Sequence, residues 1–368
     1  MRQPNTKKFY ESCRKKPLPA RLTWEALGDP ILPPATGTAA CVPDDSSYCP
    51  VERFRGPEGQ FKKLNNPLLF RWRDELLLYH GWVTNGEMVI WMAHQPFNGA
   101  NLLRGWQCYE GNPVTPVRED VKQLDAAVVS ADGKVFLYCS FVKKGGGGKR
   151  PRAFETIGAY VSDDARHFAP LGPRDGLFQG RAPEAVFYKG KIYLFCYIDP
   201  GSFDDNSDGL YAKYVLFISS DGEHFAYHGE ILPLGAPGEW DSFFVTTARV
   251  IREDDWFYLL YCGSNLHEDW LQNAGIARSR DLLRWEKSFM NPIFGRCLDP
   301  NFGSMWYPTG IRIGADYYFT YEYTGRPMQE AETAYGVRSD GRKCPRHTPD
   351  WIRGVSILKG ASLAEYFN

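Results

Sequence analysis

The sequence predicts an all-β protein, a five-bladed β-propeller with four antiparallel strands in each blade. The first observation behind this fold class is a hairpin pattern that recurs about every sixty residues. Its copies open at Asn66, Asp125, Glu184, Asp241 and Tyr307, at intervals of 59, 59, 57 and 66 residues. The second observation is a Ser-x-Asp motif with the same period, out of phase with the hairpins. Two hairpins per repeat make four strands, and a four-stranded sheet repeated radially is a propeller blade.

The clearest copy of the hairpin is RAPEAVFYKGKIYLFCYID, residues 181–199. Glu184 opens an apolar strand, a Lys-Gly-Lys turn follows, and a second strand alternates bulky residues. Bulky side chains at every second position, interrupted by a glycine turn, predict a hairpin with one buried face. The copy that opens at Tyr307 is the loosest of the five.

The Ser-x-Asp motif occurs in IGAYVSDDARHF, LFISSDGEHF and IARSRDLLRW, which end at Phe168, Phe225 and Trp285. In each copy a strand of small and apolar residues leads into the motif. After the aspartate come two residues of any type, then a basic residue or histidine, then an aromatic residue. A short strand that can end in proline, as in MNPIF around Pro292, completes the repeat. We therefore expect a third strand, a turn and a short fourth strand in each blade.

The predicted domain organisation is an N-terminal extension with a long loop over residues 1–60, followed by the propeller over residues 61–368. Residues 23–34, TWEALGDPILPP, are similar to RWEKSFMNPIF at residues 284–294. They are therefore a candidate for an outer strand that closes the ring. The C-terminal stretch from Trp351 is the other candidate, and the sequence leaves the choice open.

The composition excludes several classes of protein. The formal net charge is −1, so nothing indicates a nucleic-acid partner or an anionic membrane surface. No apolar run approaches the roughly 18 residues that a transmembrane helix needs. The start has no apolar segment of a signal peptide. The nine cysteines form no CxxC motif, so reduced thiols in a cytoplasmic protein are expected. The sequence does not indicate the oligomeric state.

The repeat openers are the candidate catalytic residues. In a propeller the first strand of each blade lies nearest the axis, so its first residues converge at one end. Asp125, Glu184 and Asp241 would then repel one another, and such a cluster is costly to keep without a function. Paired carboxyl groups suit glycosidic cleavage, in which one protonates the leaving oxygen and the other activates water or attacks the anomeric carbon. The alternative is that the openers cap backbone N–H groups or pair with Arg181 and Arg249.

The chain resembles the five-bladed propeller glycosidases over about residues 60–325. The resemblance rests on ISSDGEHF, on IARSRDLLRW, on the NPIF strand end and on the openers of the blades. This group contains glycoside hydrolase families 43, 62, 32, 68 and 117 and the mannoside phosphorylases of family 130. By position, the family 43 pattern implies that Glu184 is the general acid and that Asp125 orients it and tunes its pKa. Where these hydrolases carry the aspartate base, this chain has Asn66, which cannot act as a base.

The resemblance implies a glycoside hydrolase that cleaves a furanoside or pentose-type bond, and Asn66 leaves alternatives open. In the first alternative another carboxylate serves as the base, and the candidates are Asp241, Asp45 and Glu322. In the second the enzyme is a phosphorylase with Asp125 as the acid, and phosphate binds a cluster drawn from Arg181, Arg249, His267 and Arg326. In the third the chain is a sugar-binding or repurposed propeller without hydrolytic activity.

The residues expected to bind the substrate are polar and aromatic side chains of the inner hairpins. Most of the 15% aromatic residues must form the cores of the blades, and a few remain for stacking on a sugar. The candidates are Asn66, His80, Trp82, Arg181, Trp240, Trp306 and Glu322.

No cofactor and no metal ligand is expected. The acidic segment DPGSFDDNSDG, residues 199–209, lacks the spacing of an EF-hand, and a structural calcium ion there remains an alternative. The expected partner is a small-molecule or oligosaccharide substrate.

Overall fold

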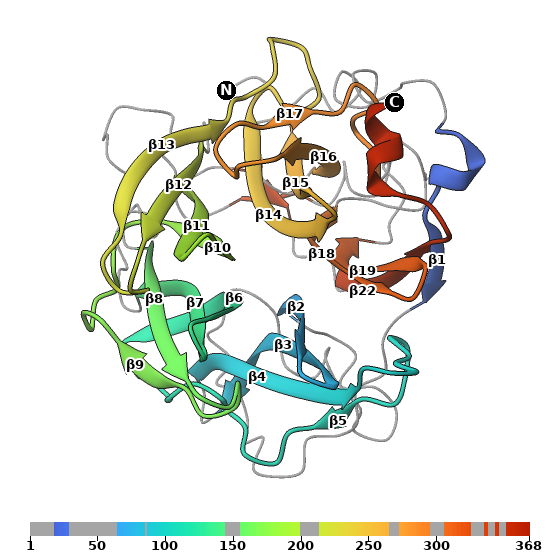
Figure 1. Cartoon of the computed structure of the whole chain (residues 1–368). Helices are drawn as coiled ribbons and strands as arrows, with labels where there is room; N and C mark the ends of the chain where they lie inside the picture. Colours follow the sequence, from blue (N-terminus) through green and yellow to red (C-terminus); the bar gives the residue numbers. More distant parts are fainter. Residues whose placement is uncertain are drawn as a thin grey trace.

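The computed structural model describes ten segments of the chain, and eight of these form five four-stranded antiparallel sheets around one axis (Figure 1). The described residues are 18–28, 65–84, 87–143, 155–198, 213–264, 272–294, 305–324, 335–337, 343–345 and 351–368. Each of the five sheets has four strands, so the predicted five-bladed propeller is confirmed. No helix within these segments is long and apolar enough to cross a membrane.

Within each blade the strands follow one another outward from the axis. Blade I consists of β2 (Asn65–Trp72), β3 (Glu75–Thr84), β4 (Glu87–Pro96) and β5 (Gln107–Cys108). Blade II consists of β6 (Val121–Ala131), β7 (Lys134–Lys143), β8 (Glu155–Ser162) and β9 (Ala169–Leu171). Blade III consists of β10 (Arg181–Tyr188), β11 (Lys191–Ile198), β12 (Lys213–Ser219) and β13 (Ala226–Leu232).

Blades IV and V complete the ring. Blade IV consists of β14 (Phe244–Glu253), β15 (Trp256–Ser264), β16 (Asn273–Ser279) and β17 (Glu286–Lys287). Blade V consists of β18 (Met305–Ile313), β19 (Asp316–Thr324), β22 (Trp351–Leu358) and β1 (Glu25–Gly28). The other elements are a two-stranded sheet, β20 (Tyr335–Val337) and β21 (Lys343–Pro345), and the short helices η1 (Ala20–Leu22) and η6 (Leu363–Phe367).

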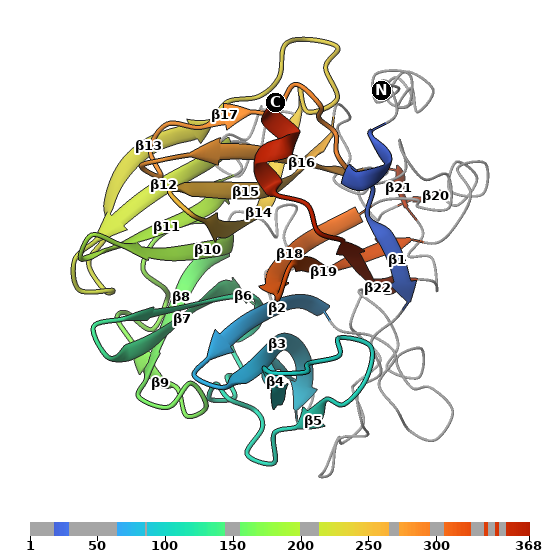
Figure 2. The ribbon, with the colours of Figure 1, turned by 45° about the vertical axis from the view of Figure 1, so that its right-hand side comes forward.

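Blade V is built from both ends of the chain, as Figure 2 shows where β1 lies beside β22. The two candidates for the closing strand both take part, because the C-terminal stretch supplies the third strand and residues 25–28 supply the outermost one. Trp24 holds the junction together. Its ring stacks on Phe319 at 4.0 Å, and its indole N–H donates to the hydroxyl of Tyr366 at 2.9 Å.

The Ser-x-Asp motif forms the turn between the third and fourth strands of a blade. In blade III, Ser219 Oγ accepts the N–H of Gly222 at 2.9 Å, and Asp221 Oδ1 accepts the N–H groups of Glu223 and His224 at 2.9 and 2.8 Å. These side chains replace the partners that the backbone loses at the end of the strand. The turn geometry therefore explains why the motif recurs in the sequence.

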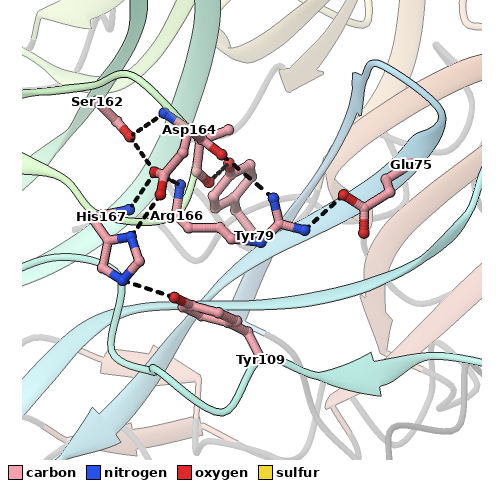
Figure 3. Close-up of polar contacts among 8 residues, drawn as sticks. Glu75, Tyr79, Tyr109, Ser162, Asp164, Arg166 and His167 are labelled. Atoms are coloured by element: carbon pink, nitrogen blue, oxygen red, sulfur yellow. Dashed lines mark hydrogen bonds and ion pairs between the residues drawn. The ribbon is translucent and has the colours of Figure 1, made fainter.

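The turn of blade II also ties two blades together (Figure 3). Arg166 Nη2 forms an ion pair with Glu75 of blade I at 2.6 Å. Tyr79 of blade I donates its hydroxyl to the carbonyl of Ala165 at 2.6 Å. The ring of His167 lies between Asp164 and Tyr109, at 2.6 and 2.9 Å. An Asp–His pair recurs at the equivalent turn of blade III, so it belongs to the turn.

The hydrophobic core consists of layers between neighbouring blades. Five clusters of buried side chains each join one pair of adjacent blades, around the whole ring. Leu77 and Tyr79 of blade I, for example, pack with Leu137 of blade II. Because every blade is fixed on both faces, the ends of the inner strands have defined positions around the axis.

Candidate active site

Each inner strand contains a β-bulge close to its start. The register between the first and second strands shifts there in all five blades. One residue of each bulge has positive φ, and these residues are Asn66 (53°), Asp125 (58°), Ala182 (46°), Thr247 (32°) and Tyr307 (52°). Positive φ is unfavourable for residues other than glycine, and such backbone persists where the surrounding structure enforces it. Bulges re-aim side chains, so these five positions form one level around the axis.

In two blades the residue predicted to open the repeat is not the bulge residue. Asn66, Asp125 and Tyr307 are bulge residues, in line with their assignment as openers. In blade III the bulge residue is Ala182, and Glu184 follows two positions later, opposite Phe195. In blade IV, Asp241 precedes β14 altogether. The alternation of apolar residues does not reveal a bulge, because the inserted residue shifts every later side chain.

A second set of residues lies at the same level on the second strands. Each of these residues pairs with the residue just before the bulge, and they are Gly81, Ser140, Tyr197, Cys262 and Glu322. The predicted residue Glu322 is therefore at the level of the bulges. Ser140 and Tyr197 were not predicted, because a single serine or tyrosine in an apolar strand gives no signal of its own.

Hydrogen bonds connect this level through four blades, in what we call the axis network. Asn66 donates its backbone N–H to Glu322 Oε1 at 2.5 Å and its side-chain amide to Asp125 Oδ1. Ser140 Oγ donates to Asp125 Oδ2 at 2.6 Å and accepts the N–H of Ala182 at 2.9 Å. The carboxylates of Asp125 and Glu322 thus lie on either side of Asn66, and both are buried.

Arg181 adds a cation to the axis network. Its Nε lies 3.8 Å from Asp125 Oδ2, and its Nη1 lies 3.5 Å from Glu155 Oε1. Both distances exceed the 2.7–2.9 Å or so of a strong charge-assisted hydrogen bond. Within the described part of the chain, Arg181 Nε has no hydrogen-bond partner. Glu155 was not predicted, since it lies on the third strand and not at an opener.

Aromatic side chains border the axis network on the side of blades III and V. The guanidinium of Arg181 lies 5.8 Å from the ring centre of Tyr197. Trp306 and Tyr307 are buried in the layer that includes blades III and IV. Burial and the charge of Asp125 raise the pKa of Tyr307 well above its ordinary value, against the opposing effect of Arg181. The phenol of Tyr307 therefore keeps its proton and can donate it in a hydrogen bond.

Glu184 lies in the wall between blades III and IV, beyond the bulge. Its Oε1 accepts the N–H of Val250 at 2.9 Å, and its Oε2 lies 3.4 Å from Arg249 Nη1. Burial raises the pKa of Glu184 to about 7, although Arg249 and the N–H of Val250 act in the opposite direction. Both oxygens of Glu184 thus face protein groups of blade IV.

The raised pKa of Glu184 predicts a pH dependence of stability. Because the folded value of about 7 exceeds the ordinary 4.5, Glu184 contributes stability that is complete below about pH 4.5 and is lost as the pH rises through about 7. We expect the wild type to lose on the order of 2–3 kcal/mol relative to Glu184→Gln between these values, at about 1.4 kcal/mol per pKa unit. Urea denaturation of both proteins at the two pH values measures this, and parallel pH curves would contradict it.

Asp241 and Trp240 lie within blade IV, apart from the axis network. Asp241 Oδ2 accepts hydrogen bonds from the hydroxyl of Tyr261 at 3.0 Å and from Lys287 Nζ at 2.7 Å. Trp240 is buried, with its ring centre 5.5 Å from that of Tyr261. Lys287 belongs to the outermost strand of the blade, so its ion pair with Asp241 stabilises the outer side of blade IV.

His80 and Trp82 lie on β3 and are both buried. Trp82 packs in the layer between blades I and V and has the surroundings of a core residue. His80 Nδ1 lies 3.4 Å from the carbonyl oxygen of Gly81, next to the level of the bulges. Of the residues predicted to bind substrate, the axis network therefore brings together Asn66, Arg181 and Glu322.

Within the described residues, no three His, Cys, Asp or Glu side chains are placed to hold a metal ion. The acidic segment 199–209 lies outside the described residues, as do Asp45, His267 and Arg326.

A cavity of about 270 Å³ lies along the later parts of the inner strands. Its lining includes Phe70, Val128, Val186 and Val250, and among the described lining residues Arg252 alone carries a charge. Acid–base chemistry needs titratable groups, and these lie at the bulges. The axis network is therefore the better candidate site.

Comparisons with known proteins support the fold assignment. No protein-family model matches the chain, and no curated protein matches it. A thermostable family-43 glycoside hydrolase is similar in structure, with a TM-score of 0.54 and 15% identity over 80% of this chain and 88% of that one. An N-acetylgalactosamine deacetylase from F. plautii, solved with blood group B trisaccharide, has a TM-score of 0.58 and 12% identity over 94% and 97%.

A β-fructofuranosidase of glycoside hydrolase family 32 from Bombyx mori is also similar, with a TM-score of 0.51 and 13% identity over 80% of this chain and 59% of that one. At these identities the likeness concerns the fold. The chain shares the five-bladed fold of family 43 and family 32 glycoside hydrolases, as the resemblance in the sequence implied.

Proposed function

We propose that this chain is a glycoside hydrolase that cleaves a furanoside or pentose-type bond at the axis network. The observation that carries the proposal is the convergence of three carboxylates at the axis network. Asp125 and Glu155 approach the guanidinium of Arg181, and Asn66 joins Glu322 to Asp125. Like charges repel, and burying them adds a desolvation cost. A pair of carboxyl groups on either side of the scissile bond is what glycosidic cleavage requires.

Glu322 and Asp125 are the proposed pair. Both contact Asn66, which holds Glu322 by its backbone N–H and Asp125 by its side-chain amide. Asp125 accepts from Asn66 and Ser140 with its two oxygens, and these bonds orient it as the carboxylate that attacks the anomeric carbon. Glu322 protonates the leaving oxygen as general acid and then, as general base, activates the water that releases the sugar from Asp125.

The proposal moves the acid role from Glu184 to Glu322. The oxygens of Glu184 face Val250 and Arg249 in the wall, one level beyond the bulges. Glu322 lies at the level of the bulges, beside Asp125. Arg181 and the phenol of Tyr307 supply donors for the hydroxyl groups of a sugar.

A furanoside substrate agrees with the resemblance in the sequence. One structural neighbour is a β-fructofuranosidase, an enzyme whose name states a furanoside substrate. Another neighbour acts as a deacetylase on N-acetylgalactosamine by its name, so the same fold supports a second reaction on carbohydrates. A substrate screen for this chain therefore includes N-acetylated sugars.

The test is turnover of a panel of aryl furanosides, aryl pentosides, aryl mannosides and N-acetylated aryl glycosides, with and without phosphate. We expect release of the aryl group from a furanoside or pentoside without phosphate, with water as the acceptor. The sugar product is identified by mass spectrometry as the free sugar.

Three other outcomes would overturn the proposal of a hydrolase. Turnover that depends on phosphate and yields a sugar phosphate favours a phosphorylase with Asp125 as the acid. The observation in favour of that second candidate is Arg181, whose Nε lacks a hydrogen-bond partner among the described residues and can bind an oxyanion. Release of acetate, or sugar binding by calorimetry without any turnover, indicates a deacetylase or a binding propeller.

A further inference from the structure

One guanidinium bridges three blades directly beyond the axis network. Arg249 of blade IV donates from Nη2 to the carbonyl oxygen of Ala126 in blade II at 3.0 Å. Its Nη1 donates to the carbonyl oxygen of Pro183 in blade III at 2.5 Å and lies 3.4 Å from Glu184. Arg249 is 3% exposed, so these protein groups are its surroundings.

We propose that Arg249 and Glu184 are positioning residues that fix the two bulges from which Asp125 and Arg181 reach the site. The inference rests on the proposed function, because it assigns the pair a task at the same site. The two carbonyl groups that Arg249 binds belong to the residues that directly follow the bulge residues of blades II and III.

The first argument concerns backbone strain. Asp125 and Ala182 have φ of 58° and 46°, which costs on the order of 1–3 kcal/mol at each residue. Such backbone relaxes unless its neighbours hold it. A hydrogen bond to the carbonyl group of the following residue, Ala126 or Pro183, restrains the backbone directly after each strained residue. Arg249 provides that restraint in both blades at once.

The second argument concerns the free edge of the inner strands. The inner strand of each blade has no neighbour on the axis side, so half of its backbone groups lack a strand partner. Arg249 satisfies the carbonyl groups of Ala126 and Pro183, and Glu184 accepts the N–H of Val250. The pair therefore links blades II, III and IV through groups that no sheet can satisfy.

The third argument comes from the equivalent positions in the other blades. Glu184 and Arg249 are each the first paired residue after the bulge, and the corresponding residues are Leu68, Ala127 and Thr309. The propeller thus tolerates uncharged residues at this position. Replacing a buried ion pair by apolar residues is often neutral for stability, so stability alone gives a weak reason to keep the charges here.

The test is the double variant Glu184→Leu with Arg249→Leu, which copies the residue of blade I into blades III and IV. It removes both charges together and leaves neither buried alone. We expect the variant to stay folded at the assay temperature with a lowered melting temperature, because the carbonyl groups of Ala126 and Pro183 lose their donor. We expect a kcat about 10- to 100-fold lower, with the pH profile of kcat little changed. Arg249→Lys with Glu184 retained is expected to recover only part of the loss, because a lysine lacks the fork that binds two carbonyl groups.

The matched control is the double variant Glu75→Leu with Arg166→Leu. It removes another ion pair between neighbouring blades, at the turn of blade II in Figure 3, and neither residue belongs to the axis network. We expect this control to keep the kcat of the wild type. A loss as large as that of the first double variant would show that any interblade pair affects catalysis, and would overturn the specific role of Arg249.

A crystal structure of the Glu184/Arg249 double variant makes the two proposals separable. We expect Asp125 and Arg181 to change their relative position, measured against the 3.8 Å between Oδ2 and Nε in the wild type. Unchanged bulges together with unchanged kcat would overturn the positioning role and leave the hydrolase proposal standing. If the wild type turns over no glycoside, the hydrolase proposal fails, and the bulge geometry of the variant still decides the positioning role.

Discussion

Replacing Glu322 by Gln is expected to lower kcat by about 100- to 10,000-fold, the usual contribution of a general acid or base. The substituted side chain keeps its size and keeps an oxygen that accepts the N–H of Asn66. It loses the ability to donate and take back a proton at the pH of the reaction. The measurement is kcat for the best aryl glycoside of the panel, together with the melting temperature.

Glu184→Gln is the comparison that makes this result decisive. It is the same chemical change at the carboxyl group to which the family resemblance assigns the role of the acid. We expect its effect on kcat to be about tenfold at most, because the amide oxygen still accepts the N–H of Val250. If Glu184→Gln abolishes turnover while Glu322→Gln retains it, the acid is Glu184 and the assignment of Glu322 is wrong.

Replacing Trp24 by Ala is expected to lower the free energy of unfolding by about 3–5 kcal/mol, the usual cost of truncating a buried aromatic side chain. Trp24 is buried between Phe319 and Phe294, at ring distances of 4.0 and 4.2 Å. Its loss would leave a cavity where the N-terminal segment meets blade V. Urea denaturation monitored by circular dichroism measures the change.

Trp24→Phe serves as the control for this prediction. It keeps an aromatic ring against Phe319 and removes the hydrogen bond to Tyr366, at a cost of about 1 kcal/mol beyond the lost area. A loss below about 1 kcal/mol for Trp24→Ala would contradict a role for this junction in closing the ring.

The fold could be predicted because its signals are local and repeated. Alternating bulky residues, glycine turns and the Ser-x-Asp motif each act within about a dozen residues, and their period placed them in five blades. The closing strand could not be predicted in the same way. Residues 25–28 pair with Val355, Ser356 and Ile357, and a pairing over such a sequence distance leaves no local pattern.

The candidate site was predicted in part. Asn66, Asp125, Arg181 and Glu322 come together, because the first three lie at or beside a bulge and Glu322 pairs with Trp306 at the same level. Glu184 and Asp241 were placed at that level by their spacing alone. A bulge adds one residue to a strand, and this shifts the side chains that follow without changing the composition of the repeat.

The amino-acid sequence by itself determined the number of blades, the number of strands in each, and the end of the axis at which polar groups gather. These three properties follow from the sixty-residue period of the sequence, because each repeat carries the same local pattern. Only the tertiary structure decided which carboxylates meet, and that Arg249 joins three blades beyond them. The physical reason is that contacts across the axis join residues of different repeats, so their partners depend on bulges and interblade packing rather than on any neighbouring residue in the chain.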